Sequence, residues 1–395
     1  MINLKKLFAK MYSFWLNKLI KINRKCKPKK SDYYETTKKM MNLHVNDIFS
    51  EKDFCKSKNI ARDYDTNDID LSFIIPVYNT ERYLSECIDS IVNQKTKFKF
   101  EIILVNNSST DNSIDIINNY HNRFPHMITV VNLPINNGPG AGKNAGINCS
   151  SGKYLSFVDS DDILYEGFVE TFMNKAITSN CDIVKGGYEQ FDSQGNIRYR
   201  KMFYNEIIDN PKTLADEIIS IDCFVWGSII KRSFFEKVRF PVGYPEIIDD
   251  RIMKLFIYSQ VNNLCYIDMI GYRYRLNLNG TTLSKKSFGL FYNQIVFYID
   301  SIYKYDNLKL EKNDLFKNII MYEFGFFIYF SSLKIKKNIK KKIFYQICNF
   351  INDYNFYSDN YDEMNSMYYD CFINYDYIKW KNLYQYRRIT NYLNK

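Results

Sequence analysis

Histidine is scarce in this chain of 395 residues. It has three histidines, His44, His121 and His126, and none stands in a metal-binding pattern such as HExxH. The nine cysteines are scattered without a CxxC pair, which excludes zinc-finger spacing and favours reduced thiols in the core of a cytoplasmic protein. The chemistry of the chain must therefore rest on carboxylates, amides and lysines.

The sequence also lacks an apolar run long enough to cross a bilayer. The nearest candidate, residues 319–333, contains Glu323, so a buried helix is the better interpretation. A content of 46% hydrophobic and 25% charged residues indicates a globular chain, and the length allows two or three domains.

Acidic residues are absent from residues 1–30. This segment carries nine lysines and Arg24, and its charge of +10 equals the net charge of the whole chain. A basic excess confined to one segment argues against a nucleic-acid-binding body. Apolar residues at helical spacing predict a basic amphipathic helix that either lies on an anionic membrane surface or packs on its own domain. Without a clean apolar core and cleavage site, a secretory signal is not expected.

Short apolar runs alternate with amphipathic segments from Leu71 onward, after a polar stretch that we interpret as a linker. We predict strands over residues 71–79, 100–107, 127–134 and 154–159, and helices over 81–94, 112–124 and 141–150. This alternation predicts a mainly parallel sheet with helices on both faces. Ligands of such sheets bind at the carboxyl ends of the strands, where four polar loops follow.

The segments beyond residue 192 are less regular. Residues 195–203 are consistent with a hairpin, 249–260 with a helix and 263–276 with a strand, whereas residues 287–395 have helical periodicity without a chemical motif.

Three aspartates crowd the end of the fourth predicted strand. Asp159, Asp161 and Asp162 follow an apolar run, and carboxylates this close repel one another unless a cation or strong donors neutralise them. If strand geometry continues, Asp159 and Asp161 face the same side and offer the oxygen ligands that suit Mg²⁺ or Mn²⁺ beside a diphosphate. The alternative, capping of the next helix, explains Asp162 but not all three.

A glycine-rich loop precedes the third predicted helix. The sequence "NNGPGAGKNAGI" over residues 136–147 would let backbone amides approach a phosphate. It matches neither GxGxxG nor the P-loop, because Asn144 follows Lys143. By itself this loop is a weak signal, and a flexible turn explains it equally well.

Four motifs, in this order and spacing, resemble one family. They are "SFIIPVYNTERYLSECIDSIVNQ", "EIILVNNSSTDNS", "NNGPGAGKNAGI" and "YLSFVDSDDILYEGF". Together they resemble glycosyltransferase family 2, whose members are inverting sugar transferases, strongly over residues 71–192 and more weakly to about residue 284. The resemblance implies an α/β fold of the Rossmann-like GT-A type. We therefore expect a basic helix and linker over 1–70, a GT-A domain over 71–286 and a helical region over 287–395.

The resemblance also implies roles for individual residues. Asp159 and Asp161 match the family's DxD pair, which holds the ribose and a divalent cation, Mn²⁺ or Mg²⁺, on the donor's diphosphate. Asp249 aligns with the catalytic base, and Asp250 is the alternative, although both could simply cap a helix. The other positions near the nucleotide are Pro76, Tyr78, Asn79, Glu81, Lys143 and Asn144.

This assignment agrees with the chemistry of inverting transfer. A carboxylate must take the acceptor's proton, and a cation must stabilise the leaving diphosphate.

Two positions depart from the family pattern. Where the family usually has DDGS, with the second carboxylate reading the base, this chain has Asn106 and Asn107. An amide both donates and accepts hydrogen bonds, so Asn107 leads to the hypothesis of relaxed or altered base selectivity instead of a strict uridine donor. Ile248 replaces the glutamate before the base, which leaves the choice between Asp249 and Asp250 open.

The sequence thus predicts a metal-assisted transferase that moves a sugar from a nucleotide-diphosphate donor to a glycan or lipid-linked acceptor. The process is bacterial capsule, lipooligosaccharide or other surface-polysaccharide synthesis, in the cytoplasm and peripherally at the inner membrane through residues 1–30. No nucleic-acid partner is expected. The alternatives are a catalytically inactive nucleotide-sugar-binding protein and a transferase that uses a CDP-linked polyol donor.

Overall fold

The computed structural model describes residues 65–209, 224–236, 238–240, 260–277 and 363–393, with single positions at 250–257 and 341–352. The chain divides into two compact units. One comprises Leu43–Leu290 and Asn307–Lys309, and the other Met1–Asn42, Phe291–Asp306 and Leu310–Lys395. The predicted amphipathic helix at residues 1–30 lies outside the described residues, as do Asp249 and the apolar run at 319–333.

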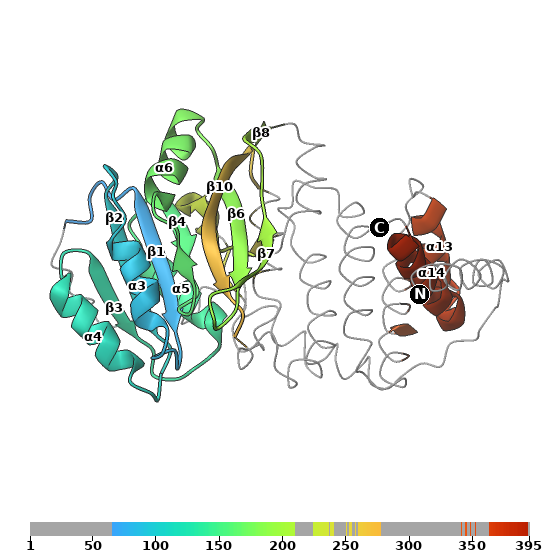
Figure 1. The fold of residues 1–395 in the computed structure, drawn as a ribbon, viewed down its shortest axis with the longest axis horizontal. Helices are drawn as coiled ribbons and strands as arrows, with labels where there is room; N and C mark the ends of the chain where they lie inside the picture. Colours follow the sequence, from blue (N-terminus) through green and yellow to red (C-terminus); the bar gives the residue numbers. More distant parts are fainter. Residues whose placement is uncertain are drawn as a thin grey trace. The chain divides into compact units, whose positions relative to one another are not determined.

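The first unit contains a ten-stranded sheet with the strand order β3-β2-β1-β4-β9-β6-β10-β5, to which β7 and β8 add at the side (Figure 1). The strands are β1 (Leu71–Val77), β2 (Phe100–Asn106), β3 (Ile128–Asn132), β4 (Tyr154–Phe157), β5 (Ile163–Leu164), β6 (Ile183–Phe191), β7 (Ile197–Lys201), β8 (Glu206–Ile208), β9 (Ser228–Lys231) and β10 (Leu264–Arg275).

The long strands of this sheet run in one direction. β1 pairs in parallel with β2 and β4, and β2 with β3. β9 is antiparallel to both β4 and β6, so β6 regains the direction of β4, and β10 is parallel to β6. The strand order reverses between β1 and β4, which is where open α/β sheets bind ligands at the carboxyl edge.

Alternating side chains of the strands build a core on each face of the sheet. On one face, Phe73 and Ile75 pack with residues of α3 (Leu84–Val92), α4 (Ser113–Arg123) and α6 (Phe168–Thr178). On the other, Ile103 and Val105 pack with Ala145 of α5 (Pro139–Cys149). Figure 1 shows α3 and α4 side by side over β1–β3. The predicted mainly parallel α/β fold with helices on both faces is confirmed.

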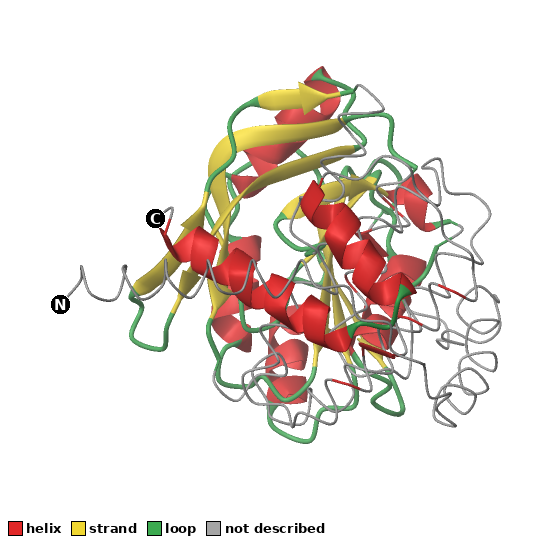
Figure 2. Ribbon diagram, turned by 90° about the vertical axis from the view of Figure 1, so that its right-hand side faces the viewer, coloured by secondary structure: helices red, strands yellow, loops and turns green. Residues whose placement is uncertain are grey.

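The sheet is strongly twisted. In Figure 2 the yellow strands at one end lie at a steep angle to those at the other, as expected from the right-handed twist of strands. The four predicted strands and three predicted helices are present within three residues of their expected bounds. The region beyond residue 192 contributes the expected strand β10 and the strand β7. Residues 195–203 were expected to be a hairpin, but they form only one arm of a hairpin, because β7 pairs with β6. β6 and β9 were not predicted.

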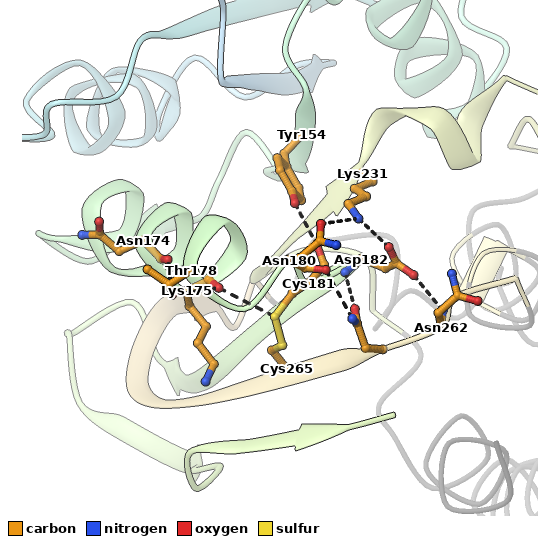
Figure 3. The surroundings of a disulfide bond; sticks show 11 residues. Tyr154, Asn174, Lys175, Thr178, Asn180, Cys181, Asp182, Lys231, Asn262 and Cys265 are labelled. Carbon is orange, nitrogen blue, oxygen red and sulfur yellow. Dashed lines mark hydrogen bonds and ion pairs between the residues drawn. A yellow bond between two sulfur atoms is a disulfide. The ribbon is translucent and has the colours of Figure 1, made fainter. Parts of the chain in front are cut away.

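A disulfide joins the beginnings of β6 and β10. Cys181 and Cys265 are bonded, with their Cα atoms 6.1 Å apart (Figure 3). Around them Lys231 contacts the Asp182 carboxylate at 2.7 Å, and the Asn262 backbone N–H donates to the same carboxylate at 2.7 Å. The expectation of reduced cysteines is therefore wrong for this pair, because parallel strands distant in sequence bring the two thiols together. It holds for Cys87, Cys149, Cys348 and Cys371, which are buried and lie outside disulfide bonds.

The second unit is described mainly through α13 (Glu363–Ile373) and α14 (Tyr377–Leu393). The Phe344 ring lies 5.3 Å from the rings of both Phe372 and Trp380, so an aromatic core holds these helices together. Within the described parts of the chain, none of the helices combines the length and apolarity needed to cross a membrane.

Candidate active site

The loops after β1 and β2 are joined by side-chain hydrogen bonds. Asn79, in a left-handed conformation with φ of 54°, accepts from the Thr110 backbone N–H at 2.8 Å. Glu81 accepts from the backbone and side-chain N–H groups of Asn112 at 2.8 and 2.7 Å. Two of the predicted nucleoside-binding residues therefore shape the loop, and both are exposed.

The other two predicted residues of this loop lie at the end of β1. Pro76 is half-buried, and a Cβ added to Gly142 of α5 would lie 2.8 Å from the Pro76 Cβ, so the glycine lets α5 approach the strand tip. Tyr78 is 45% exposed, which leaves its ring available to a ligand.

Asn107 follows β2 and is oriented by two oxygen atoms. Its Nδ2 donates to Asn136 Oδ1 and to the Gly138 carbonyl, each at 2.9 Å. Asn136 Oδ1 also accepts from the Gly138 backbone N–H, which identifies it as an oxygen, so the orientation of the Asn107 amide is unambiguous. Asn107 Oδ1 is buried and has no hydrogen-bond partner among the described residues. The N–H donors of Asn107 are therefore committed to the protein, and its one uncommitted atom is a buried acceptor.

The aspartates after β4 lie in a turn. β4 ends at Phe157, and the Asp162 N–H donates to the Asp159 carbonyl at 3.0 Å, so the expected continuation of strand geometry is wrong. Asp159 and Asp161 are half-buried and Asp162 is fully buried. Burial raises the pKa of Asp161. Burial and then the charges of Asp161 and Asp159 raise the pKa of Asp162 well above its usual range.

This turn is connected to the β1 loop and to α3. The Thr80 hydroxyl donates to Ser160 Oγ at 3.0 Å, and the Cys87 thiol lies 3.5 Å from the Asp159 carbonyl. The predicted nucleoside loop and the predicted metal turn are therefore in direct contact.

β10 holds the turn from the other side. The Tyr272 hydroxyl donates to Asp162 Oδ2 at 2.8 Å and accepts from the Asp159 N–H at 3.1 Å. Arg275 donates its backbone N–H to Asp162 Oδ1 and its Nε to the Asp161 carbonyl, both at 2.7 Å. Asp162 thus connects the turn to β10 and does not cap α6, whose N-cap is Gly167.

Tyr272 is itself fixed by packing. Its ring is fully buried and stacks on Trp226 with the ring centroids 4.6 Å apart. Sequence reasoning missed Tyr272 and Arg275, since both lie about 110 residues from the aspartates they contact. The alternation of tyrosine and arginine in "YRYR" is visible in the sequence. It does not indicate which residues these side chains contact until the pairing of β10 is known.

Lys143 of α5 forms an ion pair with Asp250. The Lys143 Nζ lies 2.5 Å from Asp250 Oδ1 and 4.9 Å from the centre of the Phe240 ring. A predicted phosphate-loop lysine and a predicted catalytic carboxylate are thereby brought together. The amide of Asn144, predicted to lie near the nucleotide, is fully buried and exchanges two 2.8 Å hydrogen bonds with the Phe240 backbone, so its polar atoms are committed to the fold.

The carboxylates of the turn fit a divalent cation. Burial disfavours the charge of Asp161, and, besides burial, the charge of Asp159 lies close enough to raise the pKa of the neighbouring Asp162. Asp159 and Asp161 offer carboxylate oxygens, the ligands that hard cations prefer. No group of three or more metal-ligating side chains is gathered in the described parts of the chain. A cation held by one or two carboxylates and completed by diphosphate oxygens is consistent with that arrangement.

Sequence comparison agrees with the geometry. The profile of the family described as "Glycosyl transferase family 2" matches residues 72–239. Glycosyltransferase GlyG of Streptococcus pneumoniae is 30% identical over 217 residues, which cover 52% of this chain and 70% of that protein. The chain belongs to glycosyltransferase family 2. The resemblance inferred from the four motifs is thereby confirmed.

Two larger proteins are also similar to this chain. Glycosyltransferase GlyA of S. pneumoniae is 32% identical, and the poly(ribitol-phosphate) beta-glucosyltransferase of Bacillus spizizenii is 30% identical. The matches cover 53% and 54% of this chain but only 31% and 33% of those proteins. The chain thus spans about a third of the length of these two relatives.

A solved structure extends the likeness in fold. S. aureus TarS 1-349, crystallised in complex with UDP-GlcNAc, superimposes with a TM-score of 0.61 over 82% of this chain and 90% of that one, at 20% sequence identity. At this identity the comparison supports the fold alone, which is the GT-A-like fold expected from the motifs.

Proposed function

We propose that the protein transfers a sugar, with inversion, from a nucleotide-diphosphate donor to a glycan or lipid-linked acceptor in bacterial surface-polysaccharide synthesis. The observation that carries the proposal is the Asp159–Asp162 turn, which lies after β4 at the strand-order reversal and is held by the β1 loop and β10. The relatives support the sugar-transfer class, and one of them is named a poly(ribitol-phosphate) beta-glucosyltransferase.

In this proposal Asp159 and Asp161 hold a divalent cation and the donor's ribose. When bound, the cation would neutralise charge on the leaving diphosphate. Asp162 does not contact substrate, since Tyr272 and Arg275 occupy both of its oxygens. Its contribution is to fix the turn.

We assign the proton acceptor to Asp250. The residue must take the proton from the acceptor hydroxyl as that oxygen attacks the anomeric carbon. The ion pair with Lys143 orients the Asp250 carboxylate and anchors it to α5. Asp249, which lies outside the described residues, remains the alternative.

The donor base is proposed to be uracil. Because both Nδ2 bonds of Asn107 go to the protein, its unpartnered Oδ1 accepts but its amide cannot donate to a base. At the ring nitrogen uracil offers an N–H to such an atom, whereas cytosine offers an acceptor there and a donor only at its exocyclic amino group. Asn107 then acts as the usual carboxylate does, which argues against the relaxed selectivity expected from the sequence. The UDP-GlcNAc complex of TarS is consistent with this proposal.

Peripheral attachment to the inner face of the cell membrane through residues 1–30 is part of the proposal, based on their charge of +10. Deletion of residues 1–30 should reduce co-sedimentation with vesicles containing anionic lipid. Unchanged pelleting would refute this attachment.

Donor hydrolysis tests the catalytic proposal. With Mn²⁺ and UDP-GlcNAc, the wild-type chain should release UDP slowly without an acceptor, and Asp161→Ala should reduce the rate by at least about 100-fold because the leaving charge is no longer neutralised. Glu166→Ala, which changes an exposed carboxylate just after the turn, serves as the control. Binding of UDP without hydrolysis of any sugar donor would favour a catalytically inactive nucleotide-sugar-binding protein. Turnover of CDP-linked polyols alone would favour a transferase that uses a CDP-linked polyol donor.

A further inference from the structure

Two arginines flank one buried glutamate across three strands. Glu189 of β6 is the register partner of Arg200 on β7 and of Arg273 on β10. Register partners on neighbouring strands present their side chains on the same face of a sheet. The three residues therefore form a row across the sheet, with a carboxylate between two guanidinium groups.

Glu189 binds each of the two arginines through the Nε atom of that arginine. Its side chain is completely buried, and its two oxygens accept from Arg200 Nε and Arg273 Nε, each at 2.9 Å. The Tyr165 hydroxyl adds a third bond at 2.5 Å. A buried carboxylate with three donors is fully satisfied, so the positions of the arginines are determined by the fold.

Among the residues that the structure describes, the outer nitrogens of these guanidinium groups have no hydrogen-bond partner. In the described residues, Glu189 is the hydrogen-bond partner of both arginines, through Nε alone. The side chains of Arg200 and Arg273 are 54% and 27% exposed. The Arg273 group also lies over the Phe191 ring at 4.5 Å, which supports its face and leaves its edge for an acceptor.

The row lies at the same edge of the sheet as the candidate active site. Glu189 is near the carboxyl end of β6 and Arg273 near that of β10, both of which run parallel to β4. Arg275, two residues further along β10, lies over the same Phe191 ring and donates to the Asp161 carbonyl. The arginine pair is therefore one aromatic side chain away from the residues that hold the aspartate turn.

We propose that Arg200 and Arg273 bind an oxyanion, a phosphodiester or carboxylate group, carried by the acceptor. This inference rests on the proposed function. Two guanidinium groups against one carboxylate leave a charge of +1, and their uncommitted N–H groups suit the bidentate contacts that oxyanions make. An ion-pair network that merely joined β6, β7 and β10 would have the same Glu189 contacts but would bind no ligand.

The test uses inorganic phosphate and the full chain saturated with Mg²⁺ and UDP, so that the donor site is filled. Calorimetric titration should find one phosphate bound to the wild type. Arg200→Gln and Arg273→Gln should each weaken this binding by about fivefold or more, since each removes a charge-assisted pair of hydrogen bonds. Arg200→Lys should recover only part of it, because lysine keeps the charge but lacks the fork.

Arg198→Gln is the matched control. Arg198 lies on the same strand, but its Nε and Nη2 are both bonded to Asp192, so its loss should change phosphate affinity by less than about twofold. Acceptor-independent hydrolysis of the donor and the affinity for UDP should be unchanged in every variant, and melting temperatures report whether the variants fold.

Three results would overturn the inference. The first is that no phosphate binds to the wild-type complex, and the second is that Arg198→Gln weakens phosphate binding as much as the Arg200 and Arg273 variants do. The third is weakened UDP binding in the Arg200 and Arg273 variants, which would assign the oxyanion to the donor. Failure of the wild type to bind UDP and to hydrolyse any donor would instead refute the proposed function, and this inference with it.

Discussion

One hydroxyl group, that of Tyr272, bridges the two ends of the aspartate turn. It donates to Asp162 and accepts from the Asp159 N–H, while its ring is fixed against Trp226. Tyr272→Phe should lower the free energy of unfolding by about 1–3 kcal/mol, because a buried carboxylate loses a donor. It should also raise KM for the donor more than it lowers kcat, since the turn binds the donor.

Steady-state kinetics and urea unfolding measure both effects. Tyr199→Phe is the control, because Tyr199 is 47% exposed on β7. If Tyr272→Phe reduced stability while KM and the apparent Mn²⁺ affinity stayed at wild-type values, Tyr272 would be a packing residue without a role in positioning.

The pKa of Asp162 predicts a pH dependence of stability. Burial raises this pKa above that of the unfolded chain, so the protonated carboxyl favours the folded state. The resulting stabilisation is complete below the unfolded pKa, near 3.8, and is lost as the pH rises through the raised folded pKa. Relative to Asp162→Asn, the metal-free wild type should therefore lose stability as the pH rises from 4 toward neutrality. Urea titrations in EDTA should give diverging profiles, and parallel profiles would contradict the assignment.

Asn107 cannot be exchanged for the family's usual aspartate without cost. In Asn107→Asp the donor nitrogen is replaced by an oxygen that faces Asn136 Oδ1 and the Gly138 carbonyl. We expect a loss of about 2–3 kcal/mol at pH 7, because a buried charge then lies against two acceptors. Asn137→Asp, at the neighbouring exposed position, should be within about 0.5 kcal/mol of the wild type. Equal melting temperatures for the two variants would show that the loop readily accommodates a carboxylate.

At the scale of elements, α5 depends on a close approach to β1. A Cβ added to Gly146 would lie 2.3 Å from Ile74 Cγ2, a distance that side chains do not tolerate. Gly146→Ala should therefore destabilise the protein by about 1–3 kcal/mol through overpacking, although alanine is the better helix former. Adding Ile74→Ala should make the double variant less destabilised than the sum of the single changes. Denaturant unfolding tests this, and additive effects would mean that α5 simply shifts away.

The elements also differ in how well the sequence predicts them. β1 to β4 were predicted because they are continuous apolar runs between turn signals. β6, "IVKGGYEQF", was missed because it carries Lys185, Glu189 and two glycines although eight of its nine residues are buried. Its charged side chains are accommodated by partners on other elements, such as the Phe224 carbonyl that accepts from Lys185, and such partners cannot be read from periodicity.

At the scale of the whole molecule, ligand binding should stabilise the chain in proportion to affinity. With Mg²⁺ present, UDP should raise the melting temperature more than CDP at the same concentration, because Asn107 presents only an acceptor. A ligand at about 100 times its Kd adds about 2.7 kcal/mol to the free energy of unfolding. In Asp161→Ala the Mg²⁺-dependent part of the shift should disappear. An equal or larger shift with CDP would refute uracil selectivity.

The sequence by itself determined the α/β class, the parallel β1–β4 segment, the family and the loops that carry the candidate site, because these follow from local periodicity and from motifs contiguous in the chain. Only the tertiary structure decided what each polar residue contacts. It paired Cys181 with Cys265, Lys143 with Asp250 and Asp162 with Tyr272, and it fixed which atom of the Asn107 amide is unpartnered. The physical reason is that hydrogen bonds and ion pairs depend on distance and direction in space. Residues that lie 84 to 110 positions apart in the chain reach the required distance and direction only when the chain has folded.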